Sequence, residues 1–104
     1  MQSLAIQGLP CAPLDAAAAF HGQWLPIVRE RLAQGQDLVL LFAAGDHSHR
    51  GWRLAAVQEL AREHAPMRIN ALAGGNAAAV AASLDYLGAA PGVTGQYLVL
   101  EETA

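Results

Sequence analysis

One uninterrupted apolar stretch, DLVLLFAAG at residues 37–45, constrains the fold of this chain more than any other segment. Asp37 opens the stretch, Gly45 closes it, and every residue between them is apolar. A strand with one face in water alternates apolar and polar residues, whereas a strand covered on both faces is apolar throughout. The stretch therefore predicts a strand that is buried on both faces.

Three further apolar runs, at 3–9, 67–73 and 96–100, alternate with longer segments in which apolar residues recur at helical spacing. The first helical segment carries its apolar side chains at Phe20, Trp24, Ile27, Val28 and Leu32. Strands that alternate with helices form βαβ units and a parallel sheet. We therefore predict an α/β fold in a single domain over residues 1–104, with about four parallel strands and three helices in the order β-α-β-α-β-α-β.

Local signals predict where these helices begin and end. Asp15 is the N-cap candidate of the first helix, and Gly35 is its stop signal. Pro26 lies inside the same helical pattern and should kink or restart the helix, because proline has no backbone N–H to donate. Asn76 and Gly88 are expected to cap and to end the third helix.

Composition excludes several functional classes. The chain has 104 residues, 54% of them apolar and 14% charged, which is far from the composition of disordered proteins. A net charge of −3 gives no basic surface for nucleic acid. No apolar stretch reaches the roughly 20 residues that a membrane span requires, and the N-terminus lacks the basic region of a signal peptide. We therefore expect a cytoplasmic protein that binds neither nucleic acid nor membrane.

The chain contains few kinds of reactive side chain. All six basic residues are arginines, so the chain contains no lysine. Cys11 is the only cysteine, which excludes an intrachain disulfide and a thiolate metal cluster. A mechanism that needs a lysine ammonium cannot operate within this chain.

Two segments together carry a resemblance to a known family: MRINALAGG at 67–75 and GVTGQYLVL at 92–100. Their order, with an alanine-rich helix between them, resembles the C-terminal half of the short-chain dehydrogenase/reductase family. The resemblance covers residues 37–100 and extends less closely over 1–36. It implies a truncated Rossmann-like sheet, with the last helix on the face opposite the first two.

The same resemblance implies that the family's catalytic group is missing. The family's tyrosine falls near Asp46, its lysine near Arg50 and its serine near Ala43 or Ala44, and no asparagine precedes Asn70. A phenol that is partly ionised near neutral pH cannot be replaced by an aspartate, and an arginine is not a proton relay.

The nucleotide-binding signature of the family is missing too. No Gly-x-x-x-Gly-x-Gly or Gly-x-Gly-x-x-Gly occurs in the chain, so backbone N–H groups have no glycine-rich turn from which to reach a pyrophosphate. Gly74 and Gly75 stand where the family has Pro-Gly and are weak cofactor-binding candidates; a plain strand-to-helix turn explains them equally well. We expect the chain to have no cofactor and to bind NAD(P) weakly or not at all.

A second weak candidate site is the segment DHSHR, the only cluster of functional side chains in the sequence. Asp46, His47, His49 and Arg50 could bind a metal ion or a ligand at the end of a strand. They could equally form a solvated loop in which the side chain of Asp46 caps the next helix.

The resemblance also implies an interface, because family members dimerise through the counterparts of the first two helices. The candidate interface side chains on these helices are Trp24, Leu25, Val28, Trp52, Val57 and Leu60. We expect a homodimer, or pairing with a full-length dehydrogenase relative. Two functions remain open: a non-catalytic interaction module, or a subunit that contributes residues 46–50 and 74–75 to a ligand site shared with a partner chain.

Overall fold

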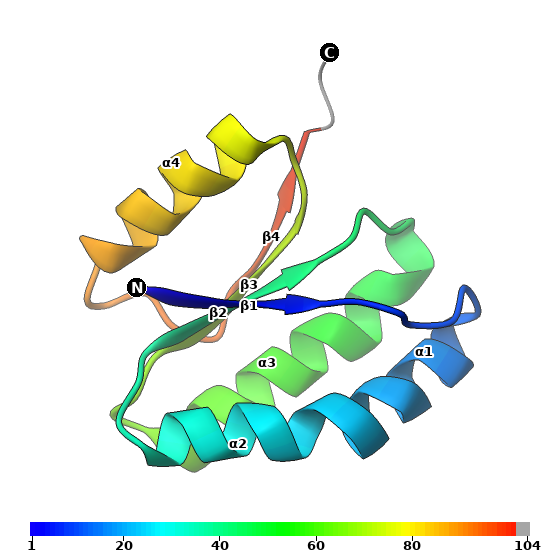
Figure 1. Cartoon of the computed structure of the whole chain (residues 1–104), viewed down its shortest axis with the longest axis horizontal. Helices are drawn as coiled ribbons and strands as arrows, with labels where there is room; N and C mark the ends of the chain where they lie inside the picture. Colours follow the sequence, from blue (N-terminus) through cyan, green and yellow to red (C-terminus); the bar gives the residue numbers. More distant parts are fainter. Residues whose placement is uncertain (102–104) are drawn as a thin grey trace.

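The computed structural model of the chain describes residues 1–101 as one sheet with helices on both faces (Figure 1). The strands are β1 (Gln2–Ile6), β2 (Leu38–Phe42), β3 (Ile69–Gly74) and β4 (Tyr97–Leu100). All neighbouring strands are parallel, and their order in the sheet is β1-β2-β3-β4. The predicted α/β fold with four parallel strands is confirmed.

Helices connect these strands. The first connection contains α1 (Pro13–Ala19), the π-helical turn η1 (Phe20–Trp24) and α2 (Leu25–Ala33). The second contains the short 3-10 helix η2 (His47–His49), which runs into α3 (Arg50–His64), and the third contains α4 (Ala77–Gly88). None of the helices in the described residues is both long and apolar enough to cross a bilayer.

Helices α1, α2 and α3 cover one face of the sheet, and α4 covers the other (Figure 1). In β2, Leu38, Leu40 and Phe42 pack in the cluster beneath the first three helices. Val39 and Leu41 point the other way, into the cluster beneath α4. The continuous apolar run thus reflects burial on both faces, as predicted.

The position of α4 requires two kinds of crossover. Each connection moves one place in the same direction across the sheet, so helices on opposite faces belong to crossovers of opposite hand. Nearly all parallel crossovers are right-handed, which would have put every helix on one face. The resemblance implied the opposite-face position of the last helix, and the structure confirms it (Figure 1).

The first helix differs from the prediction at its start. Ala12 occupies the N-cap position, and Asp15 lies inside the first turn, where its side chain makes no capping bond. The reason is Pro13, whose fixed φ suits the first helical position and starts the helix three residues earlier than an Asp15 cap would.

Pro26 interrupts this connection as predicted. The backbone N–H of Leu25 bonds to the carbonyl of Phe20, five residues back, in the π-helical turn that separates α1 from α2. Proline has no N–H to donate to the preceding turn, and its ring would clash with the carbonyl four residues back in a regular α-helix. The wider π-helical turn makes room for the proline.

The other helix signals hold, whereas all four strands are shorter than the predicted runs. Asn76 caps α4 by accepting a hydrogen bond from the N–H of Ala79 at 2.8 Å. Gly35 has a φ of +85°, as expected for a glycine that ends a helix. The strand predicted at 3–9 ends at Ile6, and the one predicted at 67–73 begins at Ile69.

Candidate functional site

A cavity of about 620 Å³ lies at the carboxyl ends of β1 and β2. Its walls come from the loop after β1, from residues 43–46 after β2, and from side chains at the start of α3. The carboxyl edge of a parallel sheet is where α/β proteins bind ligands. Of the residues that the sequence nominated, Asp46 and His49 line this cavity, whereas His47, Arg50, Gly74 and Gly75 do not.

Asp46 acts as a helix cap. Its carboxylate accepts a hydrogen bond from the backbone N–H of Ser48 at 2.9 Å and another from the Ser48 hydroxyl. The hydroxyl bond, followed by the backbone bond, lowers the pKa of Asp46 below its ordinary value, so the carboxylate is ionised at neutral pH. Capping was one of the two interpretations that the sequence left open.

His49 is held at both ring nitrogens. It is 8% exposed, and its Nε2 donates to the carbonyl oxygen of Cys11 at 3.0 Å. Its Nδ1 accepts a hydrogen bond from Nε1 of Trp52 at 3.2 Å, which assigns the proton to Nε2. With both nitrogens engaged, His49 ties the loop after β1 to α3 and has no lone pair left for a metal. Within residues 1–101, no three side chains of His, Cys, Asp or Glu come together as a metal site would need.

Arg53, which the sequence analysis did not nominate, is the most unusual side chain at the cavity. It is only 5% exposed, and its Nη1 donates to the carbonyl of Ala43 and to the hydroxyl of Tyr97, both at 3.1 Å. Its guanidinium also lies 4.6 Å from the centre of the Phe42 ring, a cation–π distance. Its spacing is the sequence signal that could have indicated its burial, because Arg53 precedes the buried Ala56, Val57 and Leu60 of α3 at helical intervals.

Gly75 has a packing role. Its φ is +85°, and a Cβ added there would lie 2.7 Å from Cδ1 and 2.8 Å from Cβ of Leu100. Gly74 also has a positive φ, of +71°. The pair therefore makes a tight turn after β3 against the side chain of Leu100 on β4, which favours the plain strand-to-helix turn of the sequence analysis.

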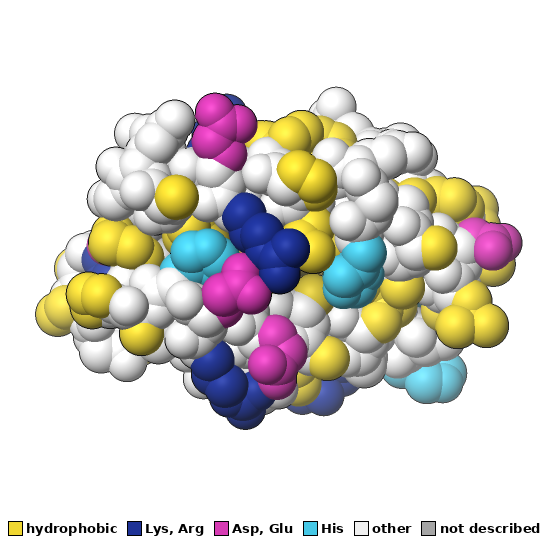
Figure 2. Space-filling model, turned by 90° about the horizontal axis from the view of Figure 1, so that it is seen from below, with side chains coloured by type: hydrophobic (Ala, Val, Ile, Leu, Met, Phe, Trp, Pro, Cys, Tyr) yellow, Lys and Arg dark blue, Asp and Glu magenta, His cyan; other side chains and the backbone are white. Residues whose placement is uncertain are grey.

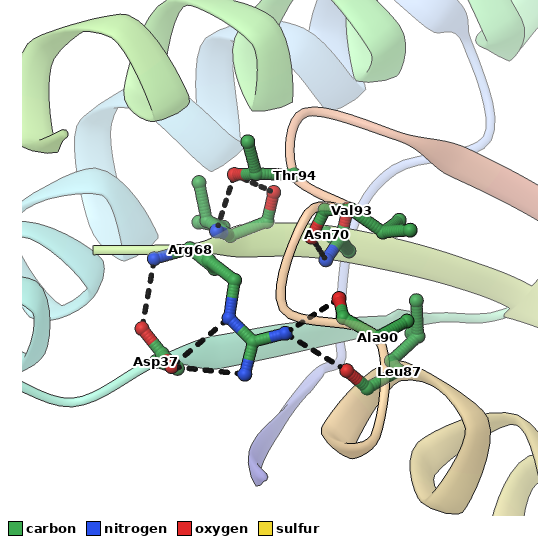
Figure 3. A network of polar contacts seen from close by, with 8 residues as sticks. Asp37, Arg68, Asn70, Leu87, Ala90, Val93 and Thr94 are labelled. Atoms are coloured by element: carbon green, nitrogen blue, oxygen red, sulfur yellow. Dashed lines mark hydrogen bonds and ion pairs between the residues drawn. The ribbon is translucent and has the colours of Figure 1, made fainter. Parts of the chain in front are cut away.

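The two segments that resemble the family, 67–75 and 92–100, are called the signature segments, and their Arg68, Asn70 and Thr94 side chains lie at the opposite, amino edge of the sheet (Figure 3). Arg68 binds Asp37 and also donates from Nη1 to the carbonyls of Leu87 and Ala90, at 2.9 and 2.8 Å. These carbonyls belong to the C-terminal end of α4 and the residues after it. Arg68 thereby fastens β2, β3 and α4 to one another.

Asn70 and Thr94 complete this cluster. Asn70 is fully buried, and its Nδ2 donates to the Val93 carbonyl at 3.0 Å (Figure 3). Its Oδ1 accepts from the N–H of Gln96 at 3.1 Å. The hydroxyl of Thr94 accepts a hydrogen bond from the N–H of Ile69 at 3.1 Å. The two signature segments bind each other and fix the path of the chain into β4.

A family model described as short chain dehydrogenase-like protein matches residues 4–100, which include both signature segments. The chain belongs to the short-chain dehydrogenase-like family. Neither a curated protein nor a solved structure matches it significantly.

The residues at the family's catalytic positions are differently employed in this short-chain dehydrogenase-like chain. Asp46, near the expected tyrosine, caps a helix, and Arg50, near the expected lysine, is exposed on α3. Tyr97 is buried with its hydroxyl on Arg53, whereas Tyr86 is 60% exposed on α4. These residues do not form a tyrosine–lysine pair.

The loop after β1 does not fit the dinucleotide that the family implies. Pyrophosphate binding requires successive free N–H groups at a helix N-terminus. Here α1 begins with Pro13, which has no N–H, and its first turn carries the carboxylate of Asp15. A phosphate at this helix end would lose a donor and face a negative charge.

A groove of about 370 Å³ lies on the outer surface of α2 and α3, beside the π-helical turn. Leu25 and Trp52 line it, and Arg29 and Glu63 lie at its side, with Nε of Arg29 and Oε1 of Glu63 2.7 Å apart. Viewed from this face, hydrophobic side chains surround a region where acidic and basic side chains lie together (Figure 2).

The six candidate interface side chains divide into two groups. Trp24, Leu25 and Trp52 are partly exposed, and two of these line the groove. The structure places Val28, Val57 and Leu60 in the core beneath the helices, with at most 3% exposure. Leu60 also lines the groove, whereas Val28 and Val57 do not.

Proposed function

We propose that this short-chain dehydrogenase-like protein is a non-catalytic interaction module that dimerises through the α2–α3 surface. The observation that carries the proposal is which side chains occupy the positions that are catalytic in the family. The sequence contains no lysine, and Asp46 is engaged as a helix cap. Without a lysine, the tyrosine–lysine pair that serves the family in proton transfer to a carbonyl cannot form within this chain.

The groove supplies the surface for self-association. Leu25 and Trp52 are half-buried in the monomer, and Ile27 on the same helix as Leu25 is 41% exposed. Aromatic and aliphatic side chains at the centre of a patch, with polar groups around them, are typical of interfaces. A second copy would bury this apolar area.

The charges at the groove favour a second copy as the partner. In a two-fold dimer the same surface meets itself, so a surface that carries both signs can be complementary to itself. Arg29 and Glu63 lie side by side across α2 and α3, and Glu59 lines the same groove. A rotation about a two-fold axis can exchange the partners of these charges between the two chains.

Light scattering after gel filtration tests the proposal. The wild-type protein should have about twice the 10.9-kDa mass of the chain at micromolar concentration. Leu25→Asp places an unpaired charge at the groove and should yield a monomer of unchanged helical content. Tyr86→Asp is the matched control, because Tyr86 is 60% exposed on α4, on the other side of the sheet. A monomeric wild-type protein would refute the dimer.

The second function, a ligand site made of residues 46–50 and 74–75, has weaker support. Only Asp46 and His49 of that set line the cavity, and both are occupied by hydrogen bonds within the loop or to neighbouring segments.

A further inference from the structure

Arg53 is the only charged residue among those buried in residues 1–101. Arg29, Arg62 and Arg68 each pair with a carboxylate, whereas Arg53 has no acidic partner in the described chain. A buried charge without a counter-ion is costly, so such a group is typically satisfied by a ligand or by strong local dipoles. Its guanidinium also lines the 620 Å³ cavity at the carboxyl edge of the sheet.

One edge of this guanidinium has no hydrogen-bond partner in residues 1–101. Nη1 makes both of the hydrogen bonds of Arg53, to Ala43 and Tyr97. Nε is buried without a partner, and Nη2 has no partner in the described residues and is not fully buried. Nε and Nη2 form the edge that grips a carboxylate with two parallel hydrogen bonds. Arg29 uses the same edge on Glu63, at 2.7 and 2.9 Å.

Gly45 lies beside the Nη1 and Nη2 end of this guanidinium. A Cβ added at Gly45 would lie 3.1 Å from Nη1 and from Nη2, so the absence of a side chain leaves room beside the guanidinium. Nη2 is the atom of this edge that an incoming anion can reach, and because Nε is buried, a second hydrogen bond to Nε requires the residues around it to move.

The other residues that line the cavity determine which class of anion fits beside Arg53. Ile6, Leu9 and Phe42 give it apolar walls, and its volume is within the range of small-molecule sites. Asp46 lines the same cavity with a negative charge. One guanidinium facing one carboxylate across an apolar space disfavours a doubly charged phosphate and suits a single negative charge on an apolar body.

We propose that this cavity binds an organic monocarboxylate, with the carboxylate on the Nε–Nη2 edge of Arg53 and the apolar body against Ile6 and Leu9. The rival explanation is that Tyr97, the Ala43 carbonyl and the Phe42 ring satisfy Arg53 without any ligand. The site is independent of the dimer proposed above, since it lies at the sheet edge and the groove lies on the outer helix surface.

Calorimetric titration with benzoate, its neutral isostere benzamide and inorganic phosphate distinguishes the two explanations. Benzoate should bind to the 104-residue chain, and benzamide and phosphate should each bind at least about tenfold more weakly. Arg53→Met should weaken benzoate binding by at least about tenfold, because the charge and the donor edge are both removed. Arg62→Met, an exposed arginine on the same helix, should leave it unchanged.

A spectroscopic measurement on the wild-type protein keeps the proposal testable if Arg53→Met fails to fold. The Nε–H resonance of Arg53 should shift downfield as benzoate is added, and Gly45→Ala, which retains the charge but crowds Nη2, should weaken binding. Tighter binding of phosphate than of benzoate, equal binding by Arg53→Met, or no benzoate binding below a Kd of about 10 mM would each overturn the proposal.

Discussion

Arg68 engages both carboxylate oxygens of Asp37: its backbone N–H donates to Oδ1 at 2.8 Å, and its Nε donates to Oδ2 at 3.1 Å. The two residues stand just before β3 and β2, so the contact joins two strands where they begin. The same guanidinium binds the end of α4, which lies on the far side of the sheet from α3 (Figure 3). One arginine therefore links three segments of the chain.

Arg68→Ala should lower the free energy of unfolding by about 3 kcal/mol, since Oδ2 of the half-buried Asp37 carboxylate and two carbonyls lose their side-chain donor. Urea denaturation followed by circular dichroism measures the loss. Arg62→Ala removes an exposed ion pair with Glu59 on α3 and should leave the urea midpoint nearly unchanged. Equal midpoints for the two variants would contradict the role assigned to Arg68.

Gly75→Ala should destabilise the chain more than Gly35→Ala, although both glycines have a φ of +85°. A Cβ at Gly35 meets nothing within 4 Å, so that variant suffers only the backbone strain of about 1–2 kcal/mol. A Cβ at Gly75 also collides with Leu100, and we expect a total of about 3 kcal/mol. Thermal unfolding of the two variants makes the comparison.

A double-mutant cycle tests the cause of that difference. In a Leu100→Gly background both Cδ1 and Cβ of residue 100 are absent, so the clash is relieved and Gly75→Ala should cost no more than Gly35→Ala does. If the cost of Gly75→Ala is the same in both backgrounds, the side chain of Leu100 is not what excludes a Cβ at this turn.

His49→Ala should cost about 2 kcal/mol of unfolding free energy, because the Trp52 indole N–H and the Cys11 carbonyl each lose a partner. His47→Ala is the control two residues away, where the side chain is exposed and does not line the cavity. Chemical denaturation with tryptophan fluorescence reports on both variants and on the surroundings of Trp52. A similar stability for the two variants would show that the bonds of His49 contribute nothing measurable.

The cap at Asp46 predicts a pH dependence. The folded pKa of Asp46 is lowered from its ordinary value of 3.8, so the ionised carboxylate stabilises the folded chain above that value. This stabilisation is lost as the pH falls through the folded pKa. Ser48→Ala removes the hydroxyl that contributes most to the shift and should raise the pKa of Asp46 toward 3.8.

Side-chain carboxyl resonances measure this effect directly. Glu63 is the internal control, because a hydrogen bond from Arg29, far from Ser48, lowers its pKa. In Ser48→Ala the titration of Asp46 should move up while that of Glu63 stays in place. An unchanged Asp46 titration would mean that the backbone bond from Ser48 alone holds the carboxylate.

Local signals in the sequence predicted much of this fold. The uninterrupted run at β2 indicated burial on two faces, Asn76 indicated the start of α4, and Pro26 indicated the break now seen as a π-helical turn. Each of these predictions depends on residues close together in the chain, and so does the helical spacing of the apolar residues along α3.

The remaining features depend on contacts between distant residues. Nothing near Gly75 reveals that Leu100 will lie against it, and nothing near Arg53 reveals that Tyr97 will accept its hydrogen bond. Helical spacing is consistent with Arg53 on the inner face of α3, but the period alone does not indicate whether a charged side chain there is buried or reaches water. Val28 and Val57 belong to apolar stripes on their helices. The sequence pattern is the same whether such a stripe packs on the sheet or on a partner chain.

The order of the strands across the sheet is also their order along the chain. During synthesis, each strand that leaves the ribosome can dock on a neighbour that has already been made. No later strand has to be inserted between two earlier ones. Assembly of this sheet can therefore proceed in one direction, keeping pace with translation.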